Sequence, residues 1–147
     1  MKLHVIAQLA LGYAREDRAT ANALAVLTLK PVAEQLRLLA PWGSEVVTLD
    51  LDAVPPGLAR LAEQIRRPIP EAGELGKTVY VVATLKAGLA REDADTANAL
   101  GVFSTRARAE GVRLAYGPDA KVVELELDRI PDGLLLTAQK IGIRLAA

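Results

Sequence analysis

A short stretch rich in alanine and polar residues occurs twice in this chain of 147 residues. It reads Ala-Arg-Glu-Asp-Arg-Ala-Thr-Ala-Asn-Ala-Leu at 14–24 and Ala-Arg-Glu-Asp-Ala-Asp-Thr-Ala-Asn-Ala-Leu at 90–100, at an offset of 76 positions. The same offset relates Glu34 to Glu110, Pro55 to Pro131, and Ile65 to Ile141. Two copies with so long a period do not form a solenoid array, which repeats every 20 to 50 residues or so. The pattern therefore indicates the tandem duplication of a whole small domain.

Each copy is predicted to begin with a strand and to continue with a helix. Apolar residues alternate at 3–9 and at 79–85, as expected of strands. Alanine- and leucine-rich sequence then predicts helices over 17–35 and 93–110, each with an Asp at its first position as N-cap. Pro31 predicts a kink or break in the first of these helices, because proline lacks the backbone donor and clashes with the preceding turn.

The second part of each copy is predicted to contain one or two strands and another helix. Gly111 is a plausible helix stop, and strand alternation follows at 112–116, with turn residues after it. Further strands are predicted over 46–51 and 122–127. Proline and glycine then introduce amphipathic helices over 55–65 and 131–141, and a closing strand is predicted at 142–145.

The predicted fold class is therefore α+β, with two copies of a ferredoxin-like βαββα(β) unit. Helices that cover one face of an antiparallel sheet are a standard two-layer arrangement. We expect a first repeat over 1–71, a short linker over 72–76 and a second repeat over 77–147. The short linker keeps the copies close, so we expect one compact unit that resembles a fused homodimer with a pseudo-two-fold axis.

Composition and charge argue against several classes of function. Eighteen basic residues balance eighteen acidic ones, so no net charge attracts nucleic acid. The chain has no cysteine and one histidine, and its acidic residues lack the spacing of known metal motifs, so we expect no metal. The glycines fit neither the dinucleotide nor the Walker A pattern, and no other cofactor signature is present. The apolar start of the chain is too short for a signal or a membrane span, so the cytoplasm is the expected location.

The repeated polar residues form the first candidate site. These are Arg15, Asp17 and Asn22 in the first copy and Arg91, Asp93 and Asn98 in the second. One interpretation is helix capping together with a pseudo-symmetric Arg/Glu interface. The other is a site in each copy for a small anion or polar ligand, because an arginine fork and the amides of a helix start bind anions.

The more polar face of each predicted sheet holds the second candidate site. His4 and its counterpart Tyr80 are expected on these faces, together with Asp50 and Glu124. If the two sheets packed through these faces, as in dimeric α+β barrels, His4 or Tyr80 beside a carboxylate could act as an acid/base pair. Otherwise these side chains belong to a solvated sheet face.

The function favoured by the sequence is a non-catalytic domain for binding or assembly. It would act on another protein, or on further copies of itself, through a pseudo-symmetric surface. The alternative is a small cofactor-independent isomerase or lyase with its acid/base site between the sheets. No serine-centred or nucleophile-elbow motif supports catalysis.

Overall fold

A computed structural model describes residues 1–8, 23–39, 44–84, 99–118, 120–130, 136, 139 and 140 of the chain. The first half contains the strands β1 (Lys2–Gln8), β2 (Ala23–Leu27) and β3 (Ser44–Asp50) and the helices α1 (Lys30–Leu39) and α2 (Pro56–Gln64). The second half contains the strands β4 (Thr78–Thr84), β5 (Ala99–Phe103) and β6 (Ala120–Glu126) and the helix α3 (Arg106–Tyr116).

The six strands form two antiparallel sheets with the same connectivity. Their strand orders are β2-β1-β3 and β5-β4-β6, so the first strand of each half lies in the centre of its sheet. The registers also correspond, since His4 pairs with Leu27 and Tyr80 pairs with Phe103. Both central strands have an irregularity at the same place in their pairing, after Ile6 and after Val82. The α+β class with antiparallel sheets is thus confirmed.

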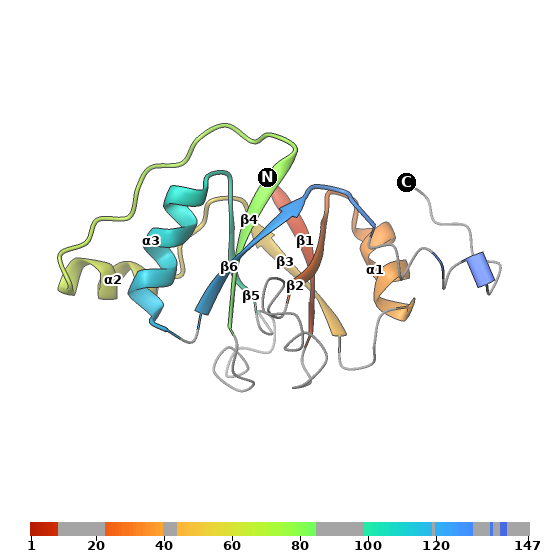
Figure 1. Ribbon diagram of the computed structural model, residues 1–147, viewed down its shortest axis with the longest axis horizontal. Coiled ribbons are helices and arrows are strands. Elements are labelled where there is room, and N and C mark those ends of the chain that lie inside the picture. Colours follow the sequence, from red (N-terminus) through yellow and green to blue (C-terminus); the bar gives the residue numbers. More distant parts are fainter. Residues whose placement is uncertain are drawn as a thin grey trace.

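The two sheets pack against each other through their apolar faces. This shared core consists of Leu3, Val5, Ala7, Val26, Val47, Val79, Val81, Ala83, Val102 and Val123. The opposite face of each sheet is covered by a helix, α1 on the first sheet and α3 on the second, so the helices lie on the two flanks of the molecule (Figure 1). The central strands β1 and β4 therefore have buried side chains on both faces, on one face against the other sheet and on the other against a helix, whereas the edge strands β3 and β6 have exposed side chains among their described residues.

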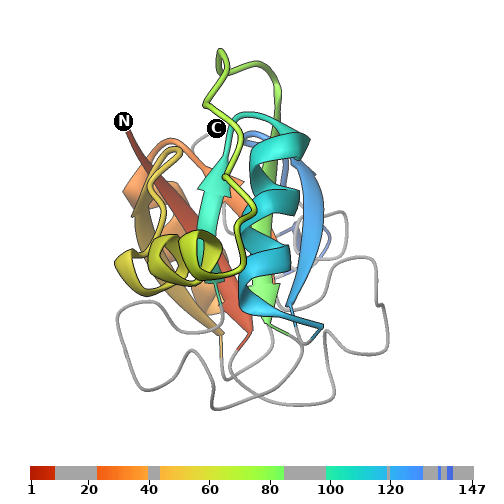
Figure 2. The same ribbon diagram turned by 90° about the vertical axis from the view of Figure 1, so that its left-hand side faces the viewer.

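The helix α2 and the segment that follows it extend the second flank. Figure 2 shows α2 beside α3, with the strands behind them. The chain then returns along α3, where Gly111 gives room to Ile69 and Pro70, and Gly73 lies against Thr105. The predicted linker 72–76 is therefore part of a longer segment that is packed on α3 rather than a free connection.

The order of elements within each half differs from the predicted one. The long helices predicted over 17–35 and 93–110 are wrong, because 23–27 and 99–103 are strands and the helices begin only at Lys30 and Arg106. Asp17 and Asp93, the predicted N-caps, lie outside the described residues. Thr105 caps α3, where its hydroxyl accepts a hydrogen bond from the backbone N–H of Arg108 at 3.3 Å.

Two further predictions, a strand at 112–116 and a helix break at Pro31, are wrong because of where α3 ends and where α1 begins. The strand predicted at 112–116 is the second half of α3, which places Ala109, Val112 and Tyr116 on the face turned to the sheet. Pro31 does not interrupt a helix, because it lies in the first turn of α1, where the backbone N–H has no helical partner.

Other predicted elements agree with the structure or lie outside the residues that it describes. The predicted helix 55–65 is confirmed as α2, and the strands predicted at 3–9, 46–51, 79–85 and 122–127 match β1, β3, β4 and β6. Most of the helix predicted over 131–141 and the whole strand predicted at 142–145 lie outside the described residues. Within the described part of the chain, no helix is long and apolar enough to cross a membrane.

Candidate functional site

His4 lies beneath α1 and not between the sheets. It alternates along β1 with residues of the shared core and is 8% exposed. Its Nδ1 is hydrogen bonded to the hydroxyl of Thr48, directly opposite on β3, at 2.9 Å. Burial is the main cause that lowers the pKa of His4 below 6.5; the positive charges of Lys30 and Lys2 lower it further, and Glu34 opposes them. The imidazole is therefore neutral at physiological pH.

Asp50 has a different partner. It lies opposite Lys2 in the β1–β3 register, and its carboxylate is 3.5 Å from the Lys2 ammonium. Both side chains are more than half exposed, so this ion pair is solvated and contributes little to stability. The sheet thus pairs His4 with a hydroxyl and Asp50 with an ammonium.

Tyr80 and Glu124 lie opposite each other in the β4–β6 register, and Arg106 contacts both. From the first turn of α3, the Arg106 guanidinium lies 3.2 Å from the Glu124 carboxylate and 5.3 Å from the centre of the Tyr80 ring. This is an ion pair combined with a cation–π contact between the start of α3 and its sheet, and both charged side chains are more than half exposed, so the ion pair contributes little to stability.

The predicted acid/base site between the sheets is therefore not assembled. The faces that meet are apolar, whereas the faces with the four candidate side chains are covered by α1 and α3. Packing these faces together removes their valine, leucine and alanine side chains from water. The described residues contain no group of three His, Asp or Glu side chains that could hold a metal ion.

The repeated polar residues cannot be placed. Arg15, Asp17, Asn22, Arg91, Asp93 and Asn98 all lie outside the described residues. The strands that flank them are described, and β1 and β4 both finish at the lower end of the molecule in Figure 1. The described strands that precede the two repeated stretches in the sequence therefore finish at the same end of the protein.

Two aspartates tie the halves together, and their roles were not recognised from the sequence. Asp52 and Asp128 are related by the offset of 76 and have φ angles of 64° and 62°. The backbone N–H of Asp52 donates to the carbonyl of Val102 at 2.8 Å, and that of Asp128 donates to the carbonyl of Val26 at 2.8 Å. Each half thus reaches the second strand of the other half. The sequence signal that could have identified them is the aspartate kept at both positions, because aspartate tolerates a left-handed backbone in a turn.

The side chains of these aspartates also accept hydrogen bonds from the other half. The Asp52 carboxylate accepts a hydrogen bond from the backbone N–H of Ser104 at 2.9 Å. The Asp128 carboxylate accepts one from the backbone N–H of Thr28 at 2.8 Å and another from its hydroxyl, also at 2.8 Å. Thr28 and Ser104 are again 76 positions apart, so the backbone hydrogen bond to the carboxylate is the same at both places, whereas the Ser104 hydroxyl bonds to Gly73 instead of to Asp52.

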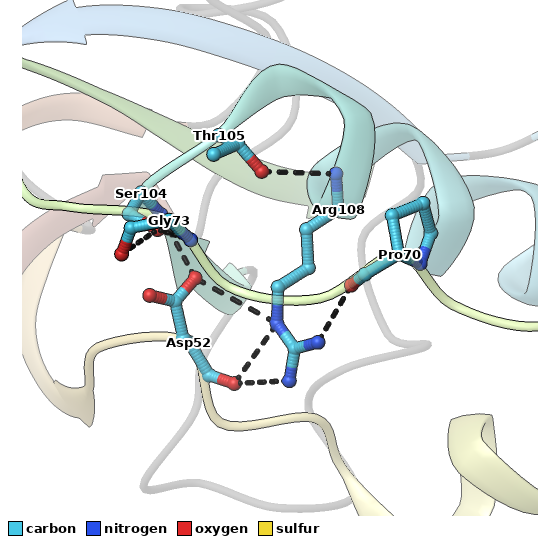
Figure 3. A network of polar contacts seen from close by, with 6 residues as sticks. All are labelled: Asp52, Pro70, Gly73, Ser104, Thr105 and Arg108. Atoms are coloured by element: carbon cyan, nitrogen blue, oxygen red, sulfur yellow. Dashed lines mark hydrogen bonds and ion pairs between the residues drawn. The ribbon is translucent and has the colours of Figure 1, made fainter.

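Arg108 contacts Asp52, and the equivalent position in the first half has no arginine, because Val32 stands there. Its Nε and Nη2 donate to the Asp52 carbonyl at 3.2 and 2.8 Å, and its Nη1 donates to the Pro70 carbonyl at 2.7 Å (Figure 3). Its Nε also lies 3.7 Å from the Asp52 carboxylate. Arg108 therefore connects α3 to the end of β3 and to the segment after α2. Sequence analysis missed it because its counterpart, Val32, is apolar.

The comparisons with known proteins do not narrow the function. No family model matches the chain, and no match is found among curated proteins or among solved structures. The functional argument therefore depends on the geometry alone.

Proposed function

We propose that this protein is a non-catalytic binding or assembly domain that acts through a pseudo-symmetric surface. The observation that carries the proposal is the reciprocal exchange at Asp52 and Asp128, in which each half donates to the other with the same geometry. Reciprocal contacts of this kind are the hallmark of an isologous interface. They support the interpretation of the chain as a tandem duplication arranged as a fused dimer.

The proposed surface is the end of the molecule at which β1 and β4 finish. β1 and β4 both finish at this end (Figure 1), and the repeated stretches with Arg15 and Arg91 follow these two strands in the sequence. A partner with two equivalent sites, including a second copy of this chain, would engage both stretches at once. Two linked contacts strengthen binding beyond either one alone.

The geometry offers less support for the isomerase or lyase alternative. A general base needs a reactive nitrogen or oxygen within hydrogen-bond reach of the substrate. The four candidate side chains instead contact Thr48, Lys2 and Arg106, and the space between the sheets is filled by apolar side chains. Binding without catalysis is thus the function better supported by the described residues.

The proposal is tested by the assembly state of the full chain and by its arginine variants. Light scattering after size exclusion, over a hundredfold range of protein concentration, measures self-association. Affinity capture with quantified mass spectrometry measures other protein partners. We expect an oligomer or a stoichiometric partner that is weakened by Arg15→Glu or Arg91→Glu and lost when both are changed.

The matched control is Arg60→Glu, which makes the same charge change on the exposed face of α2. This variant should behave as the wild type in both measurements. A wild-type protein that stays monomeric throughout and retains no partner would refute the proposal. Equal loss of binding in the control and in the double variant would show that overall charge, and not the repeated stretch, is responsible.

A further inference from the structure

A cavity of about 550 Å³ lies where α2, α3 and the segment after α2 meet. Its apolar wall includes Val54, Ala62 and Ile69, and its charged wall includes Arg66, Arg67 and Arg108. One carboxylate, that of Glu63, also lines it. The volume falls within the range of about 300 to 1,000 Å³ that is common for small-molecule sites.

Arg108 is fixed in place and still has donors to offer. A guanidinium carries five N–H groups. Three of them donate to the backbone carbonyls of Asp52 and Pro70, so two have no partner among these contacts, and Arg108 lines the cavity. The side chain is only 18% exposed, and hydrogen bonds from a charged group are strongest where water is largely excluded. No further side-chain ordering is needed for Arg108 to bind an anion.

Arg66 and Arg67 add positive charge at the mouth of the same cavity. The turn that ends α2 places them there, since the N–H groups of Arg66 and Arg67 donate to the carbonyls of Glu63 and Ala62. Arg66 has a φ of 56°, in the left-handed region that is unusual for arginine. Among the described residues, neither arginine forms an ion pair with a carboxylate of the protein.

The positive charge belongs to only one of the two halves. At an offset of 76, the positions of Arg66 and Arg67 correspond to Gly142 and Ile143, and that of Arg108 corresponds to Val32. All three cations of the cavity are thus absent from the other copy of the sequence. A purely structural role shared by both halves does not account for this difference.

We propose that this cavity is a binding site for a small organic anion. The oxyanion group, a carboxylate or a phosphate monoester, would be held by Arg108 and Arg67, and a short apolar body would pack on Val54, Ala62 and Ile69. This site is separate from the pseudo-symmetric surface, because its residues come from α2, the segments before and after it, and α3. It can therefore exist whether or not that surface binds a partner.

The test uses four probes that separate the head group from the apolar body. Phenylacetate and phenyl phosphate carry both features, inorganic phosphate carries only the charge, and phenethylammonium carries the ring with the opposite charge. Each is titrated into the full chain labelled with ¹⁵N, and amide chemical shifts are followed. We expect one or both ring-bearing anions to shift the amides of residues 62–67, 69 and 108 saturably, and to bind more tightly than inorganic phosphate does.

Variants locate the binding and show which feature it needs. Arg67→Gln should raise the Kd by about tenfold, the effect of one lost hydrogen bond to a charged group. Ala59→Phe should block the cavity while all three arginines remain. Arg60→Gln, one position further along α2 and outside the cavity lining, should leave the Kd within about twofold of the wild-type value.

Several outcomes would overturn the proposal. These are the absence of saturable shifts with both ring-bearing anions at 10 mM or so, equal binding of phenethylammonium, and equal binding of inorganic phosphate and phenyl phosphate. An equal rise of the Kd in Arg60→Gln and Arg67→Gln would likewise overturn it. If the two ring-bearing anions differ, the tighter one identifies the head group.

Discussion

Asp52 and Asp128 occupy equivalent positions but differ in their surroundings. The Asp52 side chain is 14% exposed and lies beside Arg108, whereas Asp128 is exposed. We expect Asp52→Asn to lower the free energy of unfolding by about 1 to 3 kcal/mol, because the hydrogen bond from Ser104 loses its charged acceptor and Arg108 keeps its charge beside it. Asparagine tolerates the left-handed backbone, so strain is not introduced.

Urea unfolding of three variants measures this difference. Asp128→Asn should lose less than about 1 kcal/mol, since its hydrogen bonds are exposed to water. Asp50→Asn, which removes only the solvated pair with Lys2, is the control. Equal losses for Asp52→Asn and Asp128→Asn would show that Arg108 adds nothing at Asp52.

His4 makes a predicted contribution to the pH dependence of stability. Its folded-state pKa is lowered from 6.5, so the unfolded chain binds the proton more readily. Stability is then complete above about pH 6.5 and is lost as the pH falls toward the folded-state pKa, by at most about 1.4 kcal/mol per pH unit. His4→Gln removes this titration, so between pH 8 and pH 5.5 it should lose less stability than the wild type does. An identical loss would exclude His4 as a contributor.

Side-chain positions set by strand alternation could be predicted from the sequence, whereas side-chain contacts set by tertiary packing could not. The alternation along β1 was enough to place His4 on the face opposite Leu3 and Val5. Arg108 offered no such signal, because its partners are backbone carbonyls of Asp52 and Pro70, which any residue could supply. Its position in the fold depends on how α2 packs on α3, and that is a tertiary property.

At the level of secondary structure, the strands β2 and β5 show why the predicted helices were too long. Ala23–Leu27 and Ala99–Phe103 are continuous apolar runs without alternation, which periodicity cannot distinguish from helix. They are strands because both faces are buried. Val26 and Val102 pack in the shared core, and Leu27 and Phe103 pack beneath the helices. Long-range packing overrides the helix preference of alanine and leucine here.

Gly101 provides a test of how closely β5 is packed. A Cβ added at this position would lie 2.6 Å from the ring of Phe103, which is fully buried. We expect Gly101→Ala to destabilise the protein by about 1 to 3 kcal/mol, because the ring must move within a filled core. Urea unfolding measures the change.

Gly57→Ala is the matched control for this substitution. Gly57 lies in α2, and an added Cβ meets nothing within 4 Å. The change should be neutral or should stabilise the protein by up to about 1 kcal/mol, as alanine favours helix. If Gly101→Ala were as well tolerated as Gly57→Ala, the close packing of Phe103 on β5 would be contradicted.

At the level of the whole molecule, the sequence repeat predicted equivalent halves but not the way in which they meet. The prediction placed the polar faces between the sheets as one possibility, and the structure places the apolar faces there. Valine and alanine at alternate positions could equally have faced a helix. The deciding factor is that each sheet has two faces to cover and its own half supplies one main covering helix, so the other sheet covers the second face.

A core shared by both halves should make unfolding a single cooperative event. Val81 is fully buried in that core and belongs to the second half, whereas Trp42, the one tryptophan of the chain, belongs to the first. We expect Val81→Ala to cost about 2 kcal/mol, from two buried methyl groups and the cavity that remains. Urea unfolding followed by Trp42 fluorescence and by far-UV circular dichroism should give one common midpoint, lowered equally for both signals. A Trp42 transition that stays at its wild-type midpoint while the dichroism signal moves would show that the halves unfold independently, and would contradict a shared core.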